Sequence, residues 1–140
     1  MAKGAPNTGL AEKFGCEPDQ VVQEFGWDED CDDAVREQIE DVIGSSLEDE
    51  DYDGVVDVVL LWWRDGDGDL IDDCVDALTN LADKGFVVLL VPKAGHSDHV
   101  DASDIQEAAH TAGLNAGSST KAGGNWIATK LVQGGVAKQR

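Results

Sequence analysis

The amino-acid sequence predicts an α/β fold of three layers, built on a mixed, mostly parallel sheet with a C-terminal antiparallel hairpin. Two apolar runs, residues 55–63 and 86–91, are too short to cross a membrane and are typical of strands buried on both faces. An amphipathic segment lies between them, so this strand, helix and strand predict a right-handed crossover with parallel strands. Two further candidate strands flank a glycine-rich break near the C-terminus.

The segment before the first apolar run predicts three elements. We expect a helical turn over residues 10–14, closed by Gly15, and a strand over residues 19–25, where the hydrophobicity alternates. From about Asp32, apolar side chains recur at helical spacing until Gly44, a natural terminator, and either Asp32 or Asp33 can serve as the N-cap. This last stretch is therefore predicted to be an amphipathic helix.

The central helix is expected between the two apolar strands. Its apolar side chains recur at i, i+4 and i+8 from Leu70 to Ala82. Asp69 stands at the N-cap position, and Gly85 stands where a glycine commonly ends a helix. We therefore predict one continuous helix up to the start of the second strand.

The C-terminal third predicts one more helix and the hairpin. Pro92 stops the second apolar strand, and residues 101–112 fit a helix that ends at Gly113. Residues 114–121 and 126–132 are then expected to pair as antiparallel strands at the edge of the sheet.

The length of 140 residues favours a single domain, which we assign to residues 10–133, with flexible ends at residues 1–9 and 134–140. The three cysteines, Cys16, Cys31 and Cys74, form neither a CxxC pair nor an even set, so we expect reduced thiols. The sequence has no apolar run of signal-peptide or membrane-helix length, and the expected location is cytoplasmic.

The net charge of −19 is concentrated in the first part of the chain. Residues 17–83 alone carry a net charge of −22. An excess of carboxylates disfavours nucleic acid and anionic membranes, and it favours a basic protein partner. A surface that merely keeps the protein soluble explains the same charge, and the oligomeric state is left open. The predicted acidic partner surface consists of Asp28, Glu29, Asp30, Asp32, Asp33, Glu48, Asp49, Glu50 and Asp51.

A candidate ligand or partner crevice is predicted at the carboxyl ends of the two apolar strands, between residues 62–69 and 92–95, because open α/β sheets bind ligands at that edge. Core packing is the favoured alternative for the two tryptophans and ion pairing for the arginine, and the lysine can equally be a counter-charge to the aspartates. The crevice residues are Trp62, Trp63, Arg64, Asp65, Asp67, Asp69 and Lys93.

The aspartate loop matches the first three oxygen-ligand positions of a calcium loop, at Asp65, Asp67 and Asp69. Leu70 stands where such a loop needs glycine, so we expect these aspartates to favour a helix N-terminus, and the metal assignment is left open. The pair His96 and His99 is expected to be solvated. We predict no catalytic residue and no cofactor, because the sequence has no nucleophile elbow, phosphate-binding loop or zinc-protease helix.

Several blocks of sequence closely resemble the actinobacterial form of the bacterial domain-of-unknown-function family 3052. They are residues 57–70, which contain Trp-Trp-Arg-Asp-Gly-Asp-Gly-Asp, residues 91–95, residues 111–114, and Trp126 with the strand after it. The resemblance extends over about residues 10–132, and it implies no established activity. The order of elements is similar to the C-terminal half of a methyltransferase-type Rossmann fold.

That similarity implies a glycine-rich turn after the first strand, where S-adenosylmethionine would bind. Only Gly26 is present, and Trp27 and three carboxylates follow it. The leading hypothesis is therefore a non-catalytic regulatory or protein-interaction module. The alternative is a small-molecule or nucleotide-binding protein, or a divergent S-adenosylmethionine-dependent transferase.

Overall fold

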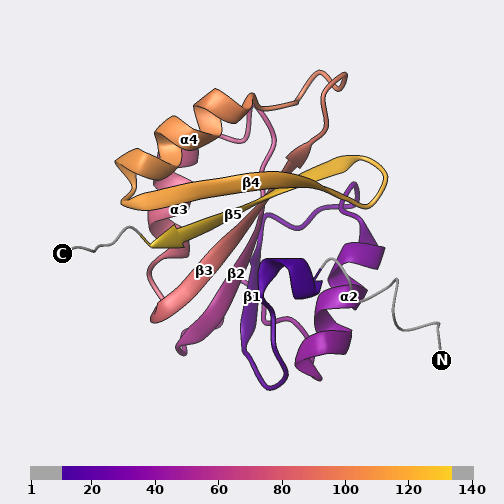
Figure 1. The fold of residues 1–140 in the computed structure, drawn as a ribbon, viewed down its shortest axis with the longest axis vertical. Helices are drawn as coiled ribbons and strands as arrows, with labels where there is room; N and C mark the ends of the chain where they lie inside the picture. The colour runs from indigo at the N-terminus through magenta and orange to yellow at the C-terminus, as the bar shows by residue number, and fades with distance from the viewer. Residues whose placement is uncertain (1–10, 134–140) are drawn as a thin grey trace.

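The computed structural model describes residues 11–133 and builds them around one five-stranded mixed sheet (Figure 1). The strands lie in the order β1-β2-β3-β5-β4, with β1, β2 and β3 parallel and β5 antiparallel to both of its neighbours. The expected ends 1–9 and 134–140 lie outside the described residues. The strands are β1 (Val22–Phe25), β2 (Val56–Trp62), β3 (Leu81–Pro92), β4 (Leu114–Ala122) and β5 (Trp126–Gln133).

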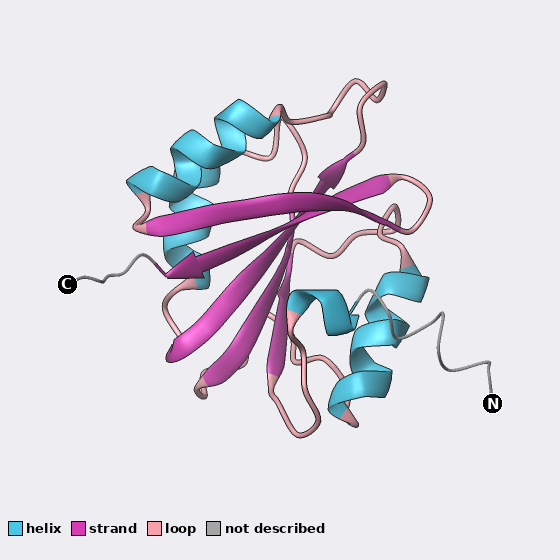
Figure 2. Cartoon of the chain, in the orientation of Figure 1, coloured by secondary structure: helices cyan, strands magenta, loops and turns pink. Residues whose placement is uncertain are grey.

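Helices cover both faces of the sheet, which confirms the three-layer prediction (Figure 2). A helical turn at residues 11–14 and α2 (Asp33–Ile43) pack on one face. On the other face lie α3 (Leu70–Ala77) and α4 (Ala102–Thr111). Among the described residues, no helix is both long enough and apolar enough to span a membrane.

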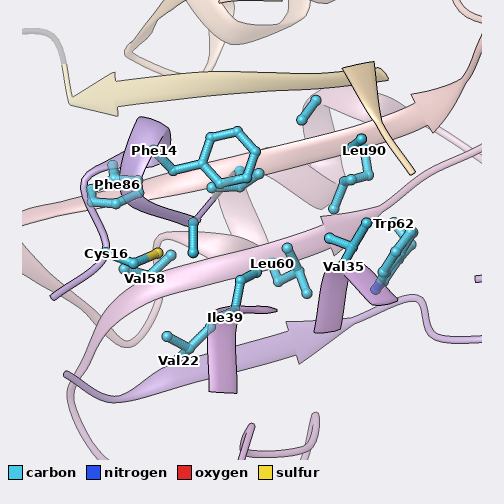
Figure 3. Close-up of a cluster of buried hydrophobic side chains, with 14 of the residues drawn as sticks. Phe14, Cys16, Val22, Val35, Ile39, Val58, Leu60, Trp62, Phe86 and Leu90 are labelled. Carbon is cyan, nitrogen blue, oxygen red and sulfur yellow. The ribbon is translucent and has the colours of Figure 1, made fainter. Parts of the chain in front are cut away.

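The burial of both faces of the sheet explains why the apolar runs at residues 55–63 and 86–91 are nearly continuous. Side chains alternate along β2, so Leu60 contributes to the core beneath α2 while Leu61 contributes to the core beneath α3 and α4. Figure 3 shows the first of these cores, where Phe14, Val35 and Ile39 gather over the central strands. Burying one such side chain stabilises the fold by roughly 2 kcal/mol.

The predicted N-caps are confirmed for α2 and α3, and the predicted end is confirmed for α2. The Asp32 carboxylate accepts a hydrogen bond from the backbone N–H of Ala34 at 2.9 Å, and Gly44 ends α2 in the left-handed region. The Asp69 carboxylate likewise accepts from the N–H of Ile71 at 2.9 Å.

The prediction of one long central helix was wrong at its end. Helix α3 ends at Ala77, strand β3 begins at Leu81, and Gly85 lies inside that strand. The N–H of Val56 donates to the carbonyl of Asn80 at 2.8 Å, and the register pairs Val56 with Leu81. Pairing with β2 therefore draws these residues into the sheet despite their helical spacing.

The other element boundaries are close to the prediction. Strand β1 is shorter than the expected span of residues 19–25, whereas the β4–β5 hairpin forms as expected. Asp57, which interrupts the first apolar run, uses its carboxylate to accept the N–H of Val21 at 2.8 Å.

The outer edge of β1 is paired to a segment that the sequence had not predicted. Glu48 forms a parallel bridge beside Gln23: the N–H of Glu48 donates to the carbonyl of Val22, and its carbonyl accepts from the N–H of Glu24, both at 2.8 Å. The chain thus leaves β1 through α2 toward one edge and later enters β2 on the other side of β1. If this single bridge is counted as a strand position outside β1, the direction in which the chain adds strands reverses between β1 and β2, and open α/β sheets place ligands at such a reversal.

Candidate functional site

A cavity of about 360 Å³ opens at the carboxyl ends of β1 and β2, where the strand order reverses. We call it the acidic crevice. Its walls come from the ends of both strands, the loop after Glu48, the aspartate loop and the outer face of α3. The lining residues are Phe25, Gly26, Glu50, Leu61, Trp62, Trp63, Asp67, Asp73 and Asp76.

The two tryptophans point to opposite sides of the sheet and each is fixed by its indole N–H. Trp62 is 1% exposed, packs edge-on against Trp126 with ring centroids 4.8 Å apart, and donates to the Glu24 carboxylate at 2.8 Å. Trp63 donates to the Asp73 carboxylate at 2.6 Å. Both rings are therefore core residues that expose only an edge to the crevice.

Four carboxylates line the acidic crevice, and among residues 11–133 no lysine or arginine does. Glu50 accepts a hydrogen bond from the N–H of Gly26 at 2.9 Å, which ties its loop to the end of β1. Partial burial raises the pKa of Asp73, the hydrogen bond from Trp63 opposes that rise, and the charges of Asp76 and Asp67 add to it. The crevice therefore favours a positively charged ligand.

Arg64 lies beside the crevice, but its guanidinium is bound to other groups of the protein. Its guanidinium donates to both oxygens of Asp30 at 2.9 and 2.6 Å, to the carbonyl of Gly26 at 3.0 Å and to Asp67 at 3.3 Å. It also stacks 5.2 Å from the centroid of the Trp126 ring. Hydrogen bonding with Arg64 lowers the pKa of Asp30. Arg64 is therefore an ion-pairing residue, which is the interpretation that the sequence favoured.

A second arginine holds a buried carboxylate on the α2 side of the sheet. Glu24 is 6% exposed and accepts from Arg36 at 2.7 and 3.0 Å, in addition to its bond from Trp62. Charge-assisted bonds of this kind offset the cost of burying the carboxylate. The pair fixes α2 to the end of β1.

The aspartate loop is organised by hydrogen bonds within the protein. Asp69 caps α3, and the Asp67 carboxylate accepts the N–H of Arg64 at 3.0 Å. The N–H of Asp65 donates to the carbonyl of Asp98 at 2.9 Å, and its side chain is exposed and does not line the crevice. Within residues 11–133, no three histidine, cysteine, aspartate or glutamate side chains are grouped as a metal site.

Lys93 lines a different cavity, of about 470 Å³, in which it is accompanied by Lys121 and Trp126. The crevice was predicted between the ends of β2 and β3, whereas the cavity lies between β1 and β2. Of the predicted residues it includes Trp62, Trp63 and Asp67, and its lining does not include Arg64, Asp65, Asp69 and Lys93. Of the two histidines, His99 places its Nδ1 2.7 Å from the carbonyl oxygen of Pro92.

The predicted acidic partner surface meets the crevice at one residue, Glu50. Asp28, Glu29, Asp30 and Asp33 are exposed in the loop after β1 and at the start of α2, and Glu48, Asp49 and Asp51 follow the outer edge of β1. Some of these carboxylates have partners within the protein: Asp32 caps α2, Asp30 binds Arg64, and Asp33 lies 3.4 Å from Arg36.

The prediction from sequence did not include three residues of this region. Asp73 and Asp76 project from α3 into the crevice at an i, i+3 spacing that could have been recognised on one face of the helix. Trp27 is 51% exposed beside the crevice residue Gly26, and its ring lies 5.9 Å from the Arg36 guanidinium carbon. The sequence gives no local signal for that exposure.

None of the three thiols is activated. Burial raises the pKa of Cys16, Cys31 and Cys74 to about 11, and the thiols are free. Burial is the largest cause of the raised pKa for each of the three thiols.

The turn after β1 does not provide the open backbone that a bound nucleotide cofactor would need. A side chain at Gly26 would collide with the backbone carbonyl of Trp62, so the missing side chain makes room for β2. The N–H of Gly26 is already bonded to Glu50. The residues present at this turn therefore do not fit the glycine-rich approach to S-adenosylmethionine.

The fold is of the methyltransferase-like Rossmann type. The crystal structure of 1,6-didemethyltoxoflavin-N1-methyltransferase from Burkholderia thailandensis, with bound S-adenosylhomocysteine, matches 94% of this chain and 78% of its own, with a TM-score of 0.56 and 15% identity. Magnesium protoporphyrin IX methyltransferase from Synechocystis, with bound SAM, matches 95% and 80%, with a TM-score of 0.53 and 11% identity. At these identities the likeness shows the fold alone.

The chain belongs to the family described as protein of unknown function (DUF3052), whose model matches residues 11–135. It is 54% identical over 126 residues to uncharacterized proteins of Mycobacterium tuberculosis and Mycobacterium bovis. The alignment covers 90% of this chain and 79% of each relative. The predicted family and its actinobacterial form are thus confirmed.

Proposed function

We propose that this protein is a non-catalytic binding module that receives a basic segment of a protein partner in the acidic crevice. The observation that supports it is the composition of the crevice: among the described residues, Glu50, Asp67, Asp73 and Asp76 line it without a lysine or arginine, and of these four only Asp67 is ion-paired, with Arg64. A lysine or arginine from a partner would supply the missing positive charge.

The surroundings of the crevice favour a macromolecular partner. The half-exposed indole of Trp27 offers an aromatic face, of the kind that anchors interfaces and attracts cations. Exposed carboxylates such as Glu29 and Asp51 extend the negative potential beyond the cavity, which would speed the approach of a basic segment. The proposed setting is the cytoplasm.

A labelled peptide of eight lysines tests this proposal by fluorescence anisotropy. Changing Glu50→Gln and Asp76→Asn together should weaken binding roughly tenfold, and Trp27→Ala should weaken it several-fold. The matched control changes Asp104→Asn and Glu107→Gln, two exposed carboxylates of α4, and should alter binding less than about twofold. Equal losses in both double variants would overturn the proposal, because the peptide would then be responding to net charge alone.

A small-molecule site, including a divergent transferase, is the second candidate function. It is favoured by the position of the crevice at the reversal of strand order, and opposed by the closed turn at Gly26. A thermal-shift comparison of S-adenosylmethionine and S-adenosylhomocysteine separates the two candidates. A rise in midpoint with both compounds, lost in Trp63→Ala, would replace the interaction module with a cofactor-binding protein.

A further inference from the structure

A second cavity, of about 400 Å³, lies on the α2 face of the sheet beside the hairpin, far in sequence from the acidic crevice. Its lining combines two lysines with an aromatic ring and short residues of β4, and it includes no carboxylate from the part of the chain that the structure describes. The lining residues are Lys13, Phe14, Gly117, Ser119, Thr120 and Lys130. In a chain of net charge −19, this composition is unusual.

Neither lysine is neutralised within the described part of the chain. The ion pairs between residues 11 and 133 involve only Arg36, Arg64 and His99 as cations. Lys130 is only partly exposed, and its Nζ lies 4.2 Å from the centroid of the Phe86 ring. Its positive charge therefore has an aromatic neighbour but no counter-ion.

The backbone around Lys130 is arranged to accommodate this ammonium group. Gly15 adopts a φ of +94°, and a side chain there would approach the Nζ of Lys130 to 3.1 Å. Opposite Lys130, the β4–β5 register shifts between Ala116 and Ser119, so that two residues face one. Such bulges redirect side chains and are frequent next to functional sites.

We propose that this cavity binds a small organic anion, with its negative group between Lys13 and Lys130 and its hydrocarbon body against Phe14. Two ammonium groups provide charge-assisted hydrogen bonds to a carboxylate, and the ring of Phe14 removes apolar surface from water. A ligand with both parts uses both features of the cavity. The site is independent of the acidic crevice and of the function proposed for it.

A matched series of eight-carbon probes tests the charge requirement: octanoate, octanol and octylammonium, each titrated into the ¹⁵N-labelled full-length chain. Octanoate should shift the amide resonances of Lys13, Gly117 and Thr120, while octanol should bind at least about tenfold more weakly. Octylammonium should leave these amides unchanged. Equal binding of octanol and octanoate, or octanoate shifts confined to residues 61–76, would overturn the proposal.

Two substitutions test the assigned residues. Lys130→Met and Lys13→Met should each weaken octanoate binding roughly fivefold, and Lys130→Arg should retain most of it. Lys84→Met removes the same charge from an exposed position outside this cavity and should change binding less than twofold. Lys13 is exposed, so its variant is informative even if Lys130→Met disturbs the packing of Phe86. An equal loss in Lys84→Met, or no loss in Lys13→Met, would refute the site.

Discussion

The two edges of the sheet differ in how their positively charged side chains are used. At the carboxyl ends of β1 and β2, Arg36 and Arg64 are both bound to carboxylates and fix loops and helices in place. At the β4–β5 hairpin, Lys121 and Lys130 line cavities and have no ion-pair partner among residues 11–133.

The difference follows from side-chain chemistry. A guanidinium binds two carboxylate oxygens at once and stacks on an aromatic ring, whereas an ammonium is a flexible point charge. The acidic half therefore retains free carboxylates around arginines that have become part of its framework. Many of its carboxylates remain exposed, whereas both of its arginines are ion-paired.

Removal of the Arg36 side chain provides the strongest test of this contrast. Arg36→Met should lower the free energy of unfolding by about 3 kcal/mol, because the Glu24 carboxylate, whose side chain is 7% exposed, loses its counter-ion. Lys130→Met should cost less than about 1 kcal/mol. Urea denaturation followed by tryptophan fluorescence measures both values.

A second substitution identifies the cause of that loss. Glu24→Gln introduced into Arg36→Met removes the buried charge and should recover a large part of the stability. If Arg36→Met and Lys130→Met cost the same, the contrast between the two regions fails.

Exchange of the two residue types is a milder test. Arg64→Lys should cost about 1–2 kcal/mol, because lysine cannot bond both oxygens of Asp30 while also stacking on Trp126. The reverse exchange, Lys121→Arg, places a guanidinium at an exposed position and should change stability by less than about 0.5 kcal/mol. Similar values for the two exchanges in a urea melt would show that Arg64 acts only as a charge.

Much of the fold was predictable because its signals are local. The double-sided burial of β2, the caps at Asp32 and Asp69, and the hairpin break all depend on residues close together in sequence. The end of α3 was not predictable in the same way, because pairing of Leu81 with Val56 decides it.

The site was predicted in its residue types but not in its position. The carboxyl edge and Trp62 to Asp67 were identified, since parallel strands bring such loops to one edge. The crevice lies between β1 and β2 because Glu48 pairs with the outer edge of β1 and thereby sets where the strand order reverses. No local pattern around Glu48 indicates that pairing, and so Lys93 was placed at the wrong cavity.

The smallest expected effect is a difference in pH dependence between two carboxylates of the acidic half. Arg64 lowers the pKa of Asp30 in the folded state, so this group stabilises the fold above its ordinary pKa near 3.8, and that contribution is lost as the pH falls further. Burial raises the pKa of Asp73, so its charged form opposes folding at neutral pH, and the penalty disappears as the pH falls through the raised pKa.

At pH 7, Asp30→Asn should therefore destabilise the protein and Asp73→Asn should stabilise it, each by up to about 1 kcal/mol, because both groups are partly solvated. In urea melts recorded across the pH range, the Asp73→Asn difference should disappear as the pH falls through the raised pKa of Asp73, and the Asp30→Asn difference should be lost only at lower pH, as the pH falls through the lowered pKa of Asp30. If the two variants shift stability in the same direction at pH 7, net charge rather than these specific contacts controls the acidic half.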